Sequence, residues 1–322
     1  MARVLVTDKI NDLAVEIVSK AAQADNLPTM DEDKLCEIIG QYDAILIRSQ
    51  TKITPKIIDH AKNLKVIARA GVGVDNVDLK SAGAKGILVV NSPDGNTHAA
   101  AEHTIAMMMA MNRNIPIANS SIKQGLWERS KFMGVEVFGK ILGIIGFGKI
   151  GSYVSKIAMA LGMKVVVYDS RAKDRVEKFG AVHIPNLDDF WNLCDFISIH
   201  APKTEETTNL INETSISKMK KGVRIINCAR GGIIDEYALA RAIENKQVAQ
   251  CAIDVFADEK NISSSPLLKF DKEVILTPHL GASIYEAQIN VALDAARQVV
   301  NVIEGKEVSN VVNKSFLKNI KH

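Results

Sequence analysis

The feature that most constrains the fold is a glycine pattern after a short apolar run. Residues 141–151 read ILGIIGFGKIG, so three glycines stand at G-x-G-x-x-G spacing before a helical stretch. Gly146 permits a tight turn, Gly148 lets the backbone approach phosphates, and Gly151 lets the helix pack on its strand. The helix N-terminus then faces the anion. We therefore predict a dinucleotide site that includes Gly146, Gly148, Lys149, Ile150 and Gly151.

The acid that ends the next apolar run indicates which nicotinamide cofactor is used. This run, VVVYD, ends in Asp169. A carboxylate at that place accepts hydrogen bonds from the adenosine ribose and repels the 2'-phosphate of NADP, which favours NAD. Arg171 follows closely and could bind such a phosphate; its alternative interpretation is a solvated surface charge.

Short apolar runs alternate with helical patterns in two series. Such alternation is typical of parallel sheets with helices on both faces. The sequence therefore predicts an α/β protein with two doubly wound parallel-sheet domains, and the second series carries the glycine motif. The runs are RVLVTD, DAILIRS, LKVIARAG, GILVVNS, ILGIIGFG, KVVVYD, CDFISIHAP, VRIINCARG, QCAIDVF and EVILTPH.

Two turn-rich segments mark the expected domain boundaries. NSPDGNT at 91–97 precedes a long helical pattern, and GAS at 281–283 precedes the closing one. We expect a flavodoxin-like substrate-binding domain at 1–95 and 285–322, with a Rossmann-type NAD-binding domain at 96–284 inserted into it. Ligands of such sheets bind at the carboxyl ends of strands, so the chemistry is expected in the cleft between domains.

Composition excludes several kinds of partner. Lys and Arg total 40 against 37 acidic residues, so no broad basic face for nucleic acid or a membrane is expected. The four cysteines show no C-x-x-C pair and no zinc spacing, which predicts no metal and a reducing compartment.

No apolar run suits a signal peptide or the ~20 residues of a membrane span. We expect a cytoplasmic protein; a chain whose organelle import peptide had been removed would read the same way.

Three side chains near strand ends are candidates for catalysis. His279 ends EVILTPH, and an imidazole exchanges protons near neutral pH. Arg230 follows VRIINCA, and its planar fork suits a carboxylate, unless it pairs with a neighbouring acid. Glu259 follows AIDVF and could orient the imidazole, although spacing does not separate it from Asp258. His200 ends FISIH in the nucleotide half, where a cofactor contact or packing is expected.

An ordered set of motifs resembles one enzyme family over nearly the whole chain. GFGKIG, HAPKT, NCARGGIIDE, AIDVFADE and PHLGAS resemble the D-isomer-specific 2-hydroxyacid dehydrogenases. The segments IRSQTKIT, ARAGVGVDNVD, SPDGNTHAAAEHTIAMMM and GLWERSKFMG are similar to the members of that family that act on 3-phospho-D-glycerate. The resemblance implies NAD-dependent oxidation of this substrate to 3-phosphohydroxypyruvate, the first step of serine biosynthesis.

The resemblance also implies roles for individual residues. Arg230 would hold the substrate carboxylate, His279 would move the hydroxyl proton, and Glu259 would raise the basicity of the imidazole. Asp254 would lie near the nicotinamide carboxamide. The cofactor contacts implied in this half of the chain are His200, Ala201, Pro202, Thr207, Cys228, Ala229, Arg230, Asp254, His279, Gly281 and Ala282.

The substrate phosphate requires cations of its own. Arg48 and Arg69 end strands of the first series, and Asn96 begins a helix whose free N–H groups suit an anion. The resemblance adds the backbone of Gly71, Val72 and Gly73, which would clasp the carboxylate. It also implies that the WERSKFMG segment lies in a homodimer or larger homo-oligomer interface, so that Arg129 or Lys131 reaches a neighbour's phosphate site. The alternative for this segment is local core packing.

Two other functions remain open at this point. A glyoxylate or hydroxypyruvate reductase shares the three catalytic candidates but needs no phosphate cluster, so Arg48, Arg69 and Arg129 argue against it. An NADH-sensing, corepressor-like binding protein does not need Arg230 together with Glu259 and His279. Many serine-forming members carry a C-terminal regulatory domain; we expect none here and hence no feedback inhibition by serine through it, but a shortened chain would have the same sequence.

Overall fold

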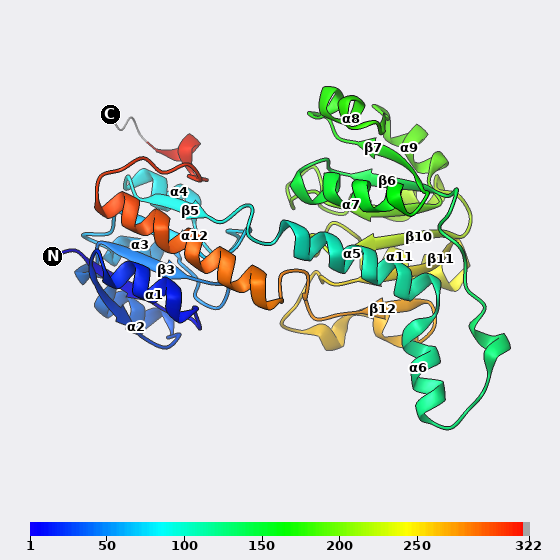
Figure 1. Cartoon of the computed structure of the whole chain (residues 1–322), viewed down its shortest axis with the longest axis horizontal. Coiled ribbons are helices and arrows are strands. Elements are labelled where there is room, and N and C mark those ends of the chain that lie inside the picture. The colour runs from blue at the N-terminus through cyan, green and yellow to red at the C-terminus, as the bar shows by residue number, and fades with distance from the viewer. Residues whose placement is uncertain (318–322) are drawn as a thin grey trace. The chain divides into compact units, whose positions relative to one another are not determined.

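Helices alternate with parallel strands along the chain in a computed structural model that describes residues 1–317 (Figure 1). The contacts divide the chain into unit 1, formed by Met1–Asn96 and the segment from Ala282 onward, and unit 2, formed by Thr97–Gly281. The second division lies before the expected end at 284, and Gly281, the last residue of unit 2, donates its N–H to Asp254. Residues 318–322, part of the expected segment 285–322, lie outside the described residues.

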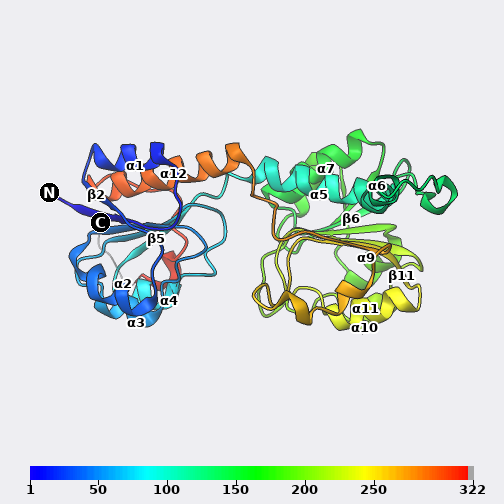
Figure 2. The same cartoon turned by 90° about the horizontal axis from the view of Figure 1, so that it is seen from below.

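Unit 1 contains a five-stranded parallel sheet in the order β2-β1-β3-β4-β5, which is the flavodoxin-like order. Figure 2 shows α1 and α12 on one face of this sheet and α2, α3 and α4 on the other, and a buried apolar cluster lies on each face. The elements are β1 (Arg3–Val6), α1 (Asp12–Ser19), β2 (Gln23–Asn26), α2 (Glu32–Ile38), β3 (Ala44–Ile47), α3 (Pro55–His60), β4 (Val66–Arg69), α4 (Leu79–Ala84), β5 (Leu88–Asn91) and α12 (Tyr285–Ile303).

Unit 2 contains a seven-stranded parallel sheet in the order β12-β11-β10-β9-β6-β7-β8. Figure 2 shows α5 and α7 on one face, and α10 and α11 on the other. The elements are α5 (Thr97–Asn112), α6 (Ile115–Lys123), β6 (Ile141–Ile145), α7 (Lys149–Ala160), β7 (Lys164–Tyr168), α8 (Lys173–Phe179), β8 (Val182–His183), α9 (Leu187–Leu193), β9 (Phe196–Ile199), α10 (Glu213–Ser217), β10 (Val223–Asn227), α11 (Glu236–Glu244), β11 (Val248–Ile253) and β12 (Val274–Leu276).

The predicted fold class is confirmed, since both sheets are parallel and each carries helices on both faces. In unit 2 the strand order reverses between β6 and β9, and ligands of such sheets bind beside the carboxyl ends of the strands at that reversal. Each apolar run identified in the sequence forms a strand. Sequence analysis missed two edge strands, β2 and β8. Among the described helices, none combines the length and apolar character needed to cross a bilayer.

Candidate functional site

The glycine loop between β6 and α7 has the shape that a pyrophosphate requires. Gly146 has φ +90°, and a Cβ there would lie 2.7 Å from the carbonyl oxygen of His200. A Cβ on Gly151 would lie 2.2 Å from the carbonyl oxygen of Gly146, so helix and loop pack backbone to backbone. Beside Gly148, in contrast, a Cβ would meet open space, and no side chain caps the helix. The N-terminus of α7 therefore has open space beside it for an anion.

Asp169 lies directly after β7 and contacts the same loop. Its Oδ2 accepts a hydrogen bond from Phe147 N at 2.7 Å, and its Oδ1 accepts one from Arg171 N at 2.8 Å. The carboxylate is thereby held against the glycine turn. Because a carboxylate can accept about four hydrogen bonds, it keeps acceptor capacity for a ribose hydroxyl. Arg171 itself is exposed.

His279 and Glu259 contact each other beside the ends of β11 and β12. His279 Nδ1 lies 2.9 Å from Glu259 Oε1, and each side chain is 46% exposed, so the pair faces solvent. The neighbouring Asp258 instead accepts hydrogen bonds from Lys260 N and Asn261 N and closes the loop's own turn. The structure thus separates two acids that spacing left equivalent, and it pairs Glu259 with the imidazole.

Asp254 holds the turn on which His279 lies. It is fully buried after β11; its Oδ1 accepts hydrogen bonds from Thr277 Oγ1 at 2.6 Å and Leu280 N at 2.7 Å, and its Oδ2 accepts one from Gly281 N at 2.9 Å. Burial alone would raise the pKa of this carboxyl, but its hydrogen bonds outweigh burial and the pKa lies below its usual value. The backbone φ of +57° at His279 is therefore maintained by anchors on both sides of the residue.

Arg230 follows β10 in a loop that Asn227 shapes. The buried Asn227 donates from Nδ2 to Arg230 O at 3.0 Å and accepts from Ala229 N at 3.0 Å. Arg230 Nη1 in turn donates to Ala229 O at 2.7 Å. A Cβ on Gly231 would lie 1.8 Å from Phe256 O, so this loop packs backbone to backbone against the segment that leads to Glu259. Half-buried Arg230 is thus placed within the same unit as the imidazole pair.

The loop after β9 passes beside the glycine turn. His200 is hydrogen-bonded to Ser198 Oγ through Nε2 at 2.8 Å, and burial lowers its pKa to about 3. It therefore stays neutral at physiological pH and does not serve as an acid there. Thr207 donates to Pro202 O at 2.7 Å and accepts from Thr204 N, so it closes the loop that carries Ala201 and Pro202.

Cys228 and Asp254 lie close to His103, which sequence analysis did not single out. One potential ligand atom from each of His103, Cys228 and Asp254 lies within 4.8 Å of the others. His103 Nε2 is 3.2 Å from Asp254 Oδ1. Burial, reinforced by the Asp254 charge, raises the pKa of Cys228 to about 12, so the thiol stays protonated. Because His103 lies inside α5, far away in sequence, spacing contained no signal for this contact.

In unit 1, the two candidate arginines follow neighbouring strands. Arg48 comes directly after β3 and Arg69 ends β4, and Ile47 pairs with Arg69 in the sheet register. Gly71 has φ +150°, and a Cβ there would lie 1.6 Å from Arg69 Nη1. The guanidinium of Arg69 therefore occupies the space that any larger residue at 71 would fill. Asn91 donates to Val72 O at 2.6 Å and holds this loop.

A buried aspartate positions the backbone of Arg48. Asp8 accepts hydrogen bonds from Arg48 N at 2.6 Å and from Thr51 Oγ1 at 2.6 Å. Asn76 donates from Nδ2 to Arg48 O at 2.7 Å. Sequence analysis singled out neither Asp8 nor Asn76, although the acid at the end of the first strand was a visible signal.

The residues expected to bind substrate or cofactor are divided between the two units. Asn96 ends the first segment of unit 1 and Ala282 begins the second, whereas Arg129 belongs to unit 2. Arg129 lies on an exposed arm after α6, which Figure 1 shows projecting from the helices around it. Asn96 Oδ1 is buried and has no hydrogen-bond partner among the described residues. The substrate contacts expected of Asn96 and Arg129, and the cofactor contact expected of Ala282, therefore remain proposals.

Comparisons with known proteins identify this arrangement. A family model described as D-isomer specific 2-hydroxyacid dehydrogenase, NAD binding domain, matches residues 105–281. A curated D-3-phosphoglycerate dehydrogenase from Synechocystis is 51% identical over 97% of this chain. The chain spans 56% of the length of that relative.

Two solved structures of similar fold cover almost the whole chain. A glyoxylate reductase from Paecilomyes thermophila superposes with a TM-score of 0.88 at 29% identity, covering 98% of this chain and 99% of its own. A D-lactate dehydrogenase from Aquifex aeolicus, complexed with NAD and lactic acid, has a TM-score of 0.84 at 29% identity, covering 94% of this chain and 96% of its own.

Proposed function

The chain belongs to the D-isomer specific 2-hydroxyacid dehydrogenase family, and we propose that it oxidises 3-phospho-D-glycerate to 3-phosphohydroxypyruvate with NAD. The observation that carries this proposal is the contact between His279 and Glu259 at the strand ends of the NAD-binding domain, with Arg230 in a neighbouring loop. The relative from Synechocystis supports the choice of substrate.

His279 acts as the acid and base of the reaction. Glu259 accepts the Nδ1 hydrogen, because a carboxylate has no proton of its own to donate. Nε2 is then the nitrogen that takes the hydroxyl proton during oxidation and returns it during reduction. The same carboxylate favours the protonated imidazole and fixes the orientation of the ring.

Arg230 binds the substrate carboxylate through its planar guanidinium, which presents two parallel N–H donors. Asn227 sets the backbone position of Arg230, and Ala229 O accepts a hydrogen bond from Nη1, so the guanidinium is oriented before the substrate arrives. Binding and orientation then come from one residue, and orientation lowers the barrier by holding the reacting carbon near the cofactor.

The residues of the glycine loop fit NAD. The open space beside Gly148 and the uncapped N-terminus of α7 suit the pyrophosphate, and Asp169 suits the adenosine ribose. The charge of Asp169 disfavours a 2'-phosphate, which agrees with the NAD-binding family. When bound, NAD accepts the hydride of the carbinol carbon.

Substitution of the residues expected to bind the phosphate tests whether the substrate is phosphorylated. We expect Arg48→Ala and Arg69→Ala each to raise KM for 3-phosphohydroxypyruvate about tenfold or more, because a hydrogen bond to a charged group contributes about 1.5 to 3 kcal/mol. Hydroxypyruvate lacks the phosphate, so its kcat/KM should stay near that of the unaltered protein. Steady-state reduction of both substrates with NADH measures the difference.

Arg297→Ala is the matched control, since Arg297 is exposed on α12 of the same unit. It should leave both substrates unaffected. Equal losses on the two substrates in Arg48→Ala and Arg69→Ala would assign these arginines to folding or to the carboxylate. That result would favour the glyoxylate or hydroxypyruvate reductase; a protein of similar fold is named as a glyoxylate reductase.

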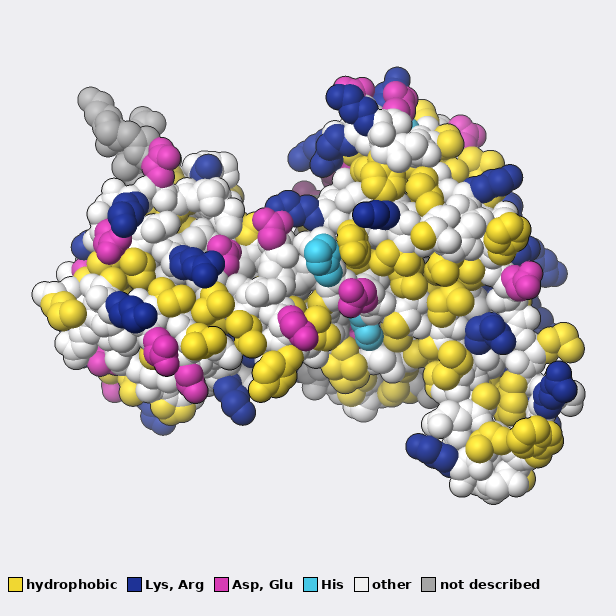
Figure 3. Space-filling model, in the orientation of Figure 1, with side chains coloured by type: hydrophobic (Ala, Val, Ile, Leu, Met, Phe, Trp, Pro, Cys, Tyr) yellow, Lys and Arg dark blue, Asp and Glu magenta, His cyan; other side chains and the backbone are white. Residues whose placement is uncertain are grey.

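We also propose that the protein forms a homodimer through the arm after α6. Large apolar side chains are exposed there: Trp127 and Met133 are each 84% exposed and Phe138 is 75% exposed. Figure 3 shows hydrophobic side chains gathered on this arm. Large apolar side chains exposed close together in the chain are characteristic of an interaction site. Arg129 and Lys131 on the same arm would then lie close to a neighbouring subunit.

Substitution of the arm is expected to shift the protein toward monomers. Trp127→Glu with Met133→Glu places two charges in the proposed interface, where burial without a partner is unfavourable. Sedimentation equilibrium measures the change in mass. Leu13→Glu, which charges an exposed apolar residue on α1, is the control and should leave the mass unchanged. A dimer that persists in the double variant would exclude the arm as the interface.

The location in the cell remains a proposal. All four cysteines are free thiols in the structure, which is usual in a reducing compartment and supports the cytoplasm.

A further inference from the structure

The loop that carries Glu259 has no apolar anchor of its own. Residues 257–264 are all exposed, whereas residues 251–256, which lead from β11 to the loop, are buried. Internal hydrogen bonds close single turns, as between Asp258 and Asn261, but they do not attach the loop to the rest of unit 2. The position of Glu259 relative to His279 therefore depends on how the two ends of this loop are held.

A single carboxylate holds both ends. Glu236 Oε1 accepts a hydrogen bond from Ala257 N at 2.7 Å, and Glu236 Oε2 accepts one from Ser265 Oγ at 2.6 Å. Ala257 begins the exposed segment and Ser265 follows it directly. Hydrogen bonds to an ionised acceptor are the strong ones, and here each oxygen of the carboxylate serves one end of the loop.

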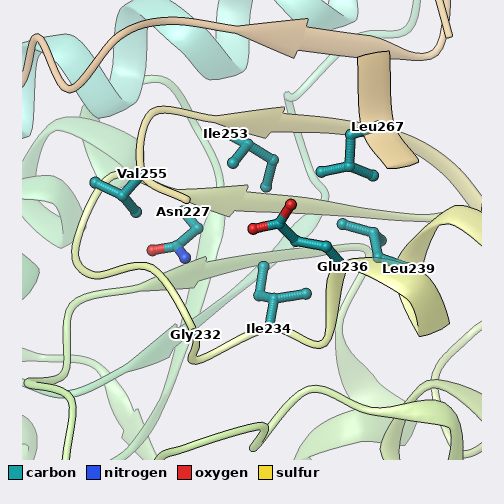
Figure 4. Close-up of a pocket in the computed structure, with 8 residues that line it drawn as sticks. All are labelled: Asn227, Gly232, Ile234, Glu236, Leu239, Ile253, Val255 and Leu267. Carbon is teal, nitrogen blue, oxygen red and sulfur yellow. The ribbon is translucent and has the colours of Figure 1, made fainter. Parts of the chain in front are cut away.

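The carboxylate of Glu236 lies at the N-terminus of the helix α11. Glu236 is its first residue, directly after the N-cap Asp235, where the helix dipole favours a negative charge. Figure 4 shows the side chain pointing into a small cavity lined by Ile234, Leu239, Ile253 and Leu267. With apolar walls around it, the carboxylate is directed to the two donors of the loop.

We propose that Glu236 is a positioning residue, which holds the loop so that Glu259 contacts the imidazole of His279. The inference rests on the proposed function, in which that contact supports acid–base catalysis. Because Gly231 packs against Phe256 O, the loop of Arg230 lies against the same anchored segment. Glu236 touches none of the reacting groups, so its effect passes through the loop.

Kinetics of five variants test the proposal. Glu236→Ala should lower kcat for reduction of 3-phosphohydroxypyruvate about tenfold while KM changes little, since the loop supplies orientation of the imidazole and no substrate contact. Glu236→Gln should restore most of the rate, because its amide oxygen accepts from Ala257 N and its amide nitrogen donates to Ser265 Oγ. Glu244→Ala is the matched control on the same helix, where the carboxylate pairs with Lys269, and should behave as the unaltered protein.

The other two variants are Glu259→Gln and the combination of Glu236→Ala with Glu259→Gln. If Glu236 acts through Glu259, the double variant should be no slower than Glu259→Gln alone, because the two changes remove one interaction. Multiplied losses, or failure of Glu236→Gln to restore the rate, would overturn the proposal in favour of general destabilisation. Full activity of Glu236→Ala beside an impaired Glu259→Gln would overturn it while leaving the proposed function intact.

Amide hydrogen exchange separates the inference from the activity. In Glu236→Ala, peptides covering 257–265 should exchange roughly tenfold faster or more than in the unaltered protein, and peptides of β6 should be unchanged. If the unaltered protein turned over none of the tested substrates, the proposed function would fail, and this measurement would still decide the inference. Unchanged exchange at 257–265 would overturn it.

Discussion

Replacement of His279 by alanine is expected to lower kcat by roughly a hundred- to ten-thousand-fold while NADH binding stays close to that of the unaltered protein. The imidazole is the group that takes the substrate proton in the proposed reaction, and its Nδ1 is engaged by Glu259. Steady-state turnover and titration of NADH fluorescence measure the two quantities separately.

The backbone of His279 requires a second variant. Its φ of +57° disfavours most side chains but is tolerated by asparagine, so His279→Asn removes the imidazole with less backbone strain. Both variants should lose turnover. His60→Ala is the control, since His60 is exposed at the end of α3 in unit 1. Turnover within a factor of two of the unaltered protein in either His279 variant would move the acid–base role to another group.

Arg230→Ala is expected to have the second largest effect, with a loss of roughly a hundredfold or more in kcat/KM. A guanidinium that grips a carboxylate with two charged hydrogen bonds supplies about 1.5 to 3 kcal/mol through each, and it also orients the reacting carbon. Both a higher KM and a lower kcat should follow, because the same contact binds and orients. Initial rates over a range of 3-phosphohydroxypyruvate concentrations resolve these two effects.

Arg230→Lys tests whether the planar geometry of the guanidinium matters in addition to its charge. Arg230→Lys keeps the charge but not the two parallel donors, so it should recover only part of the loss. Arg241→Ala removes an exposed guanidinium of α11 that pairs with Glu213, and it should leave the rates unchanged. Unchanged kinetics in Arg230→Ala would show that the carboxylate is bound elsewhere.

The apolar runs and the glycine motif predicted most of the fold because they depend on requirements of a few consecutive residues, such as the burial of a strand. A buried parallel strand must be apolar on both faces, and β3, with the sequence AILI, is buried at every residue. The missed strand β2 reads QADN and is only partly buried, because an edge strand pairs on one side alone. It owes its conformation to β1, a neighbour that its own sequence does not specify.

Placing His279 and Arg230 near a common edge was also possible from sequence, since parallel strands end at the same side of a sheet. The sequence alone did not show whether Asp258 or Glu259 contacts the imidazole. Adjacent loop residues differ in what their side chains reach, and the 2.9 Å contact to the imidazole follows from the path of the loop. That path depends on Glu236, which sequence analysis did not single out.

Most of the strands, the cofactor turn and the candidate reacting groups were thus accessible from residue type and spacing, because each arises within a few consecutive residues. The residues that hold those groups in place by hydrogen bonds were not accessible from the sequence. Asp254 holds Gly281 across 27 positions, Asp8 holds Arg48 across 40, and Glu236 holds Ser265 across 29. Such hydrogen bonds depend on where the packed sheets bring distant backbone groups, and no local pattern in the chain encodes that placement.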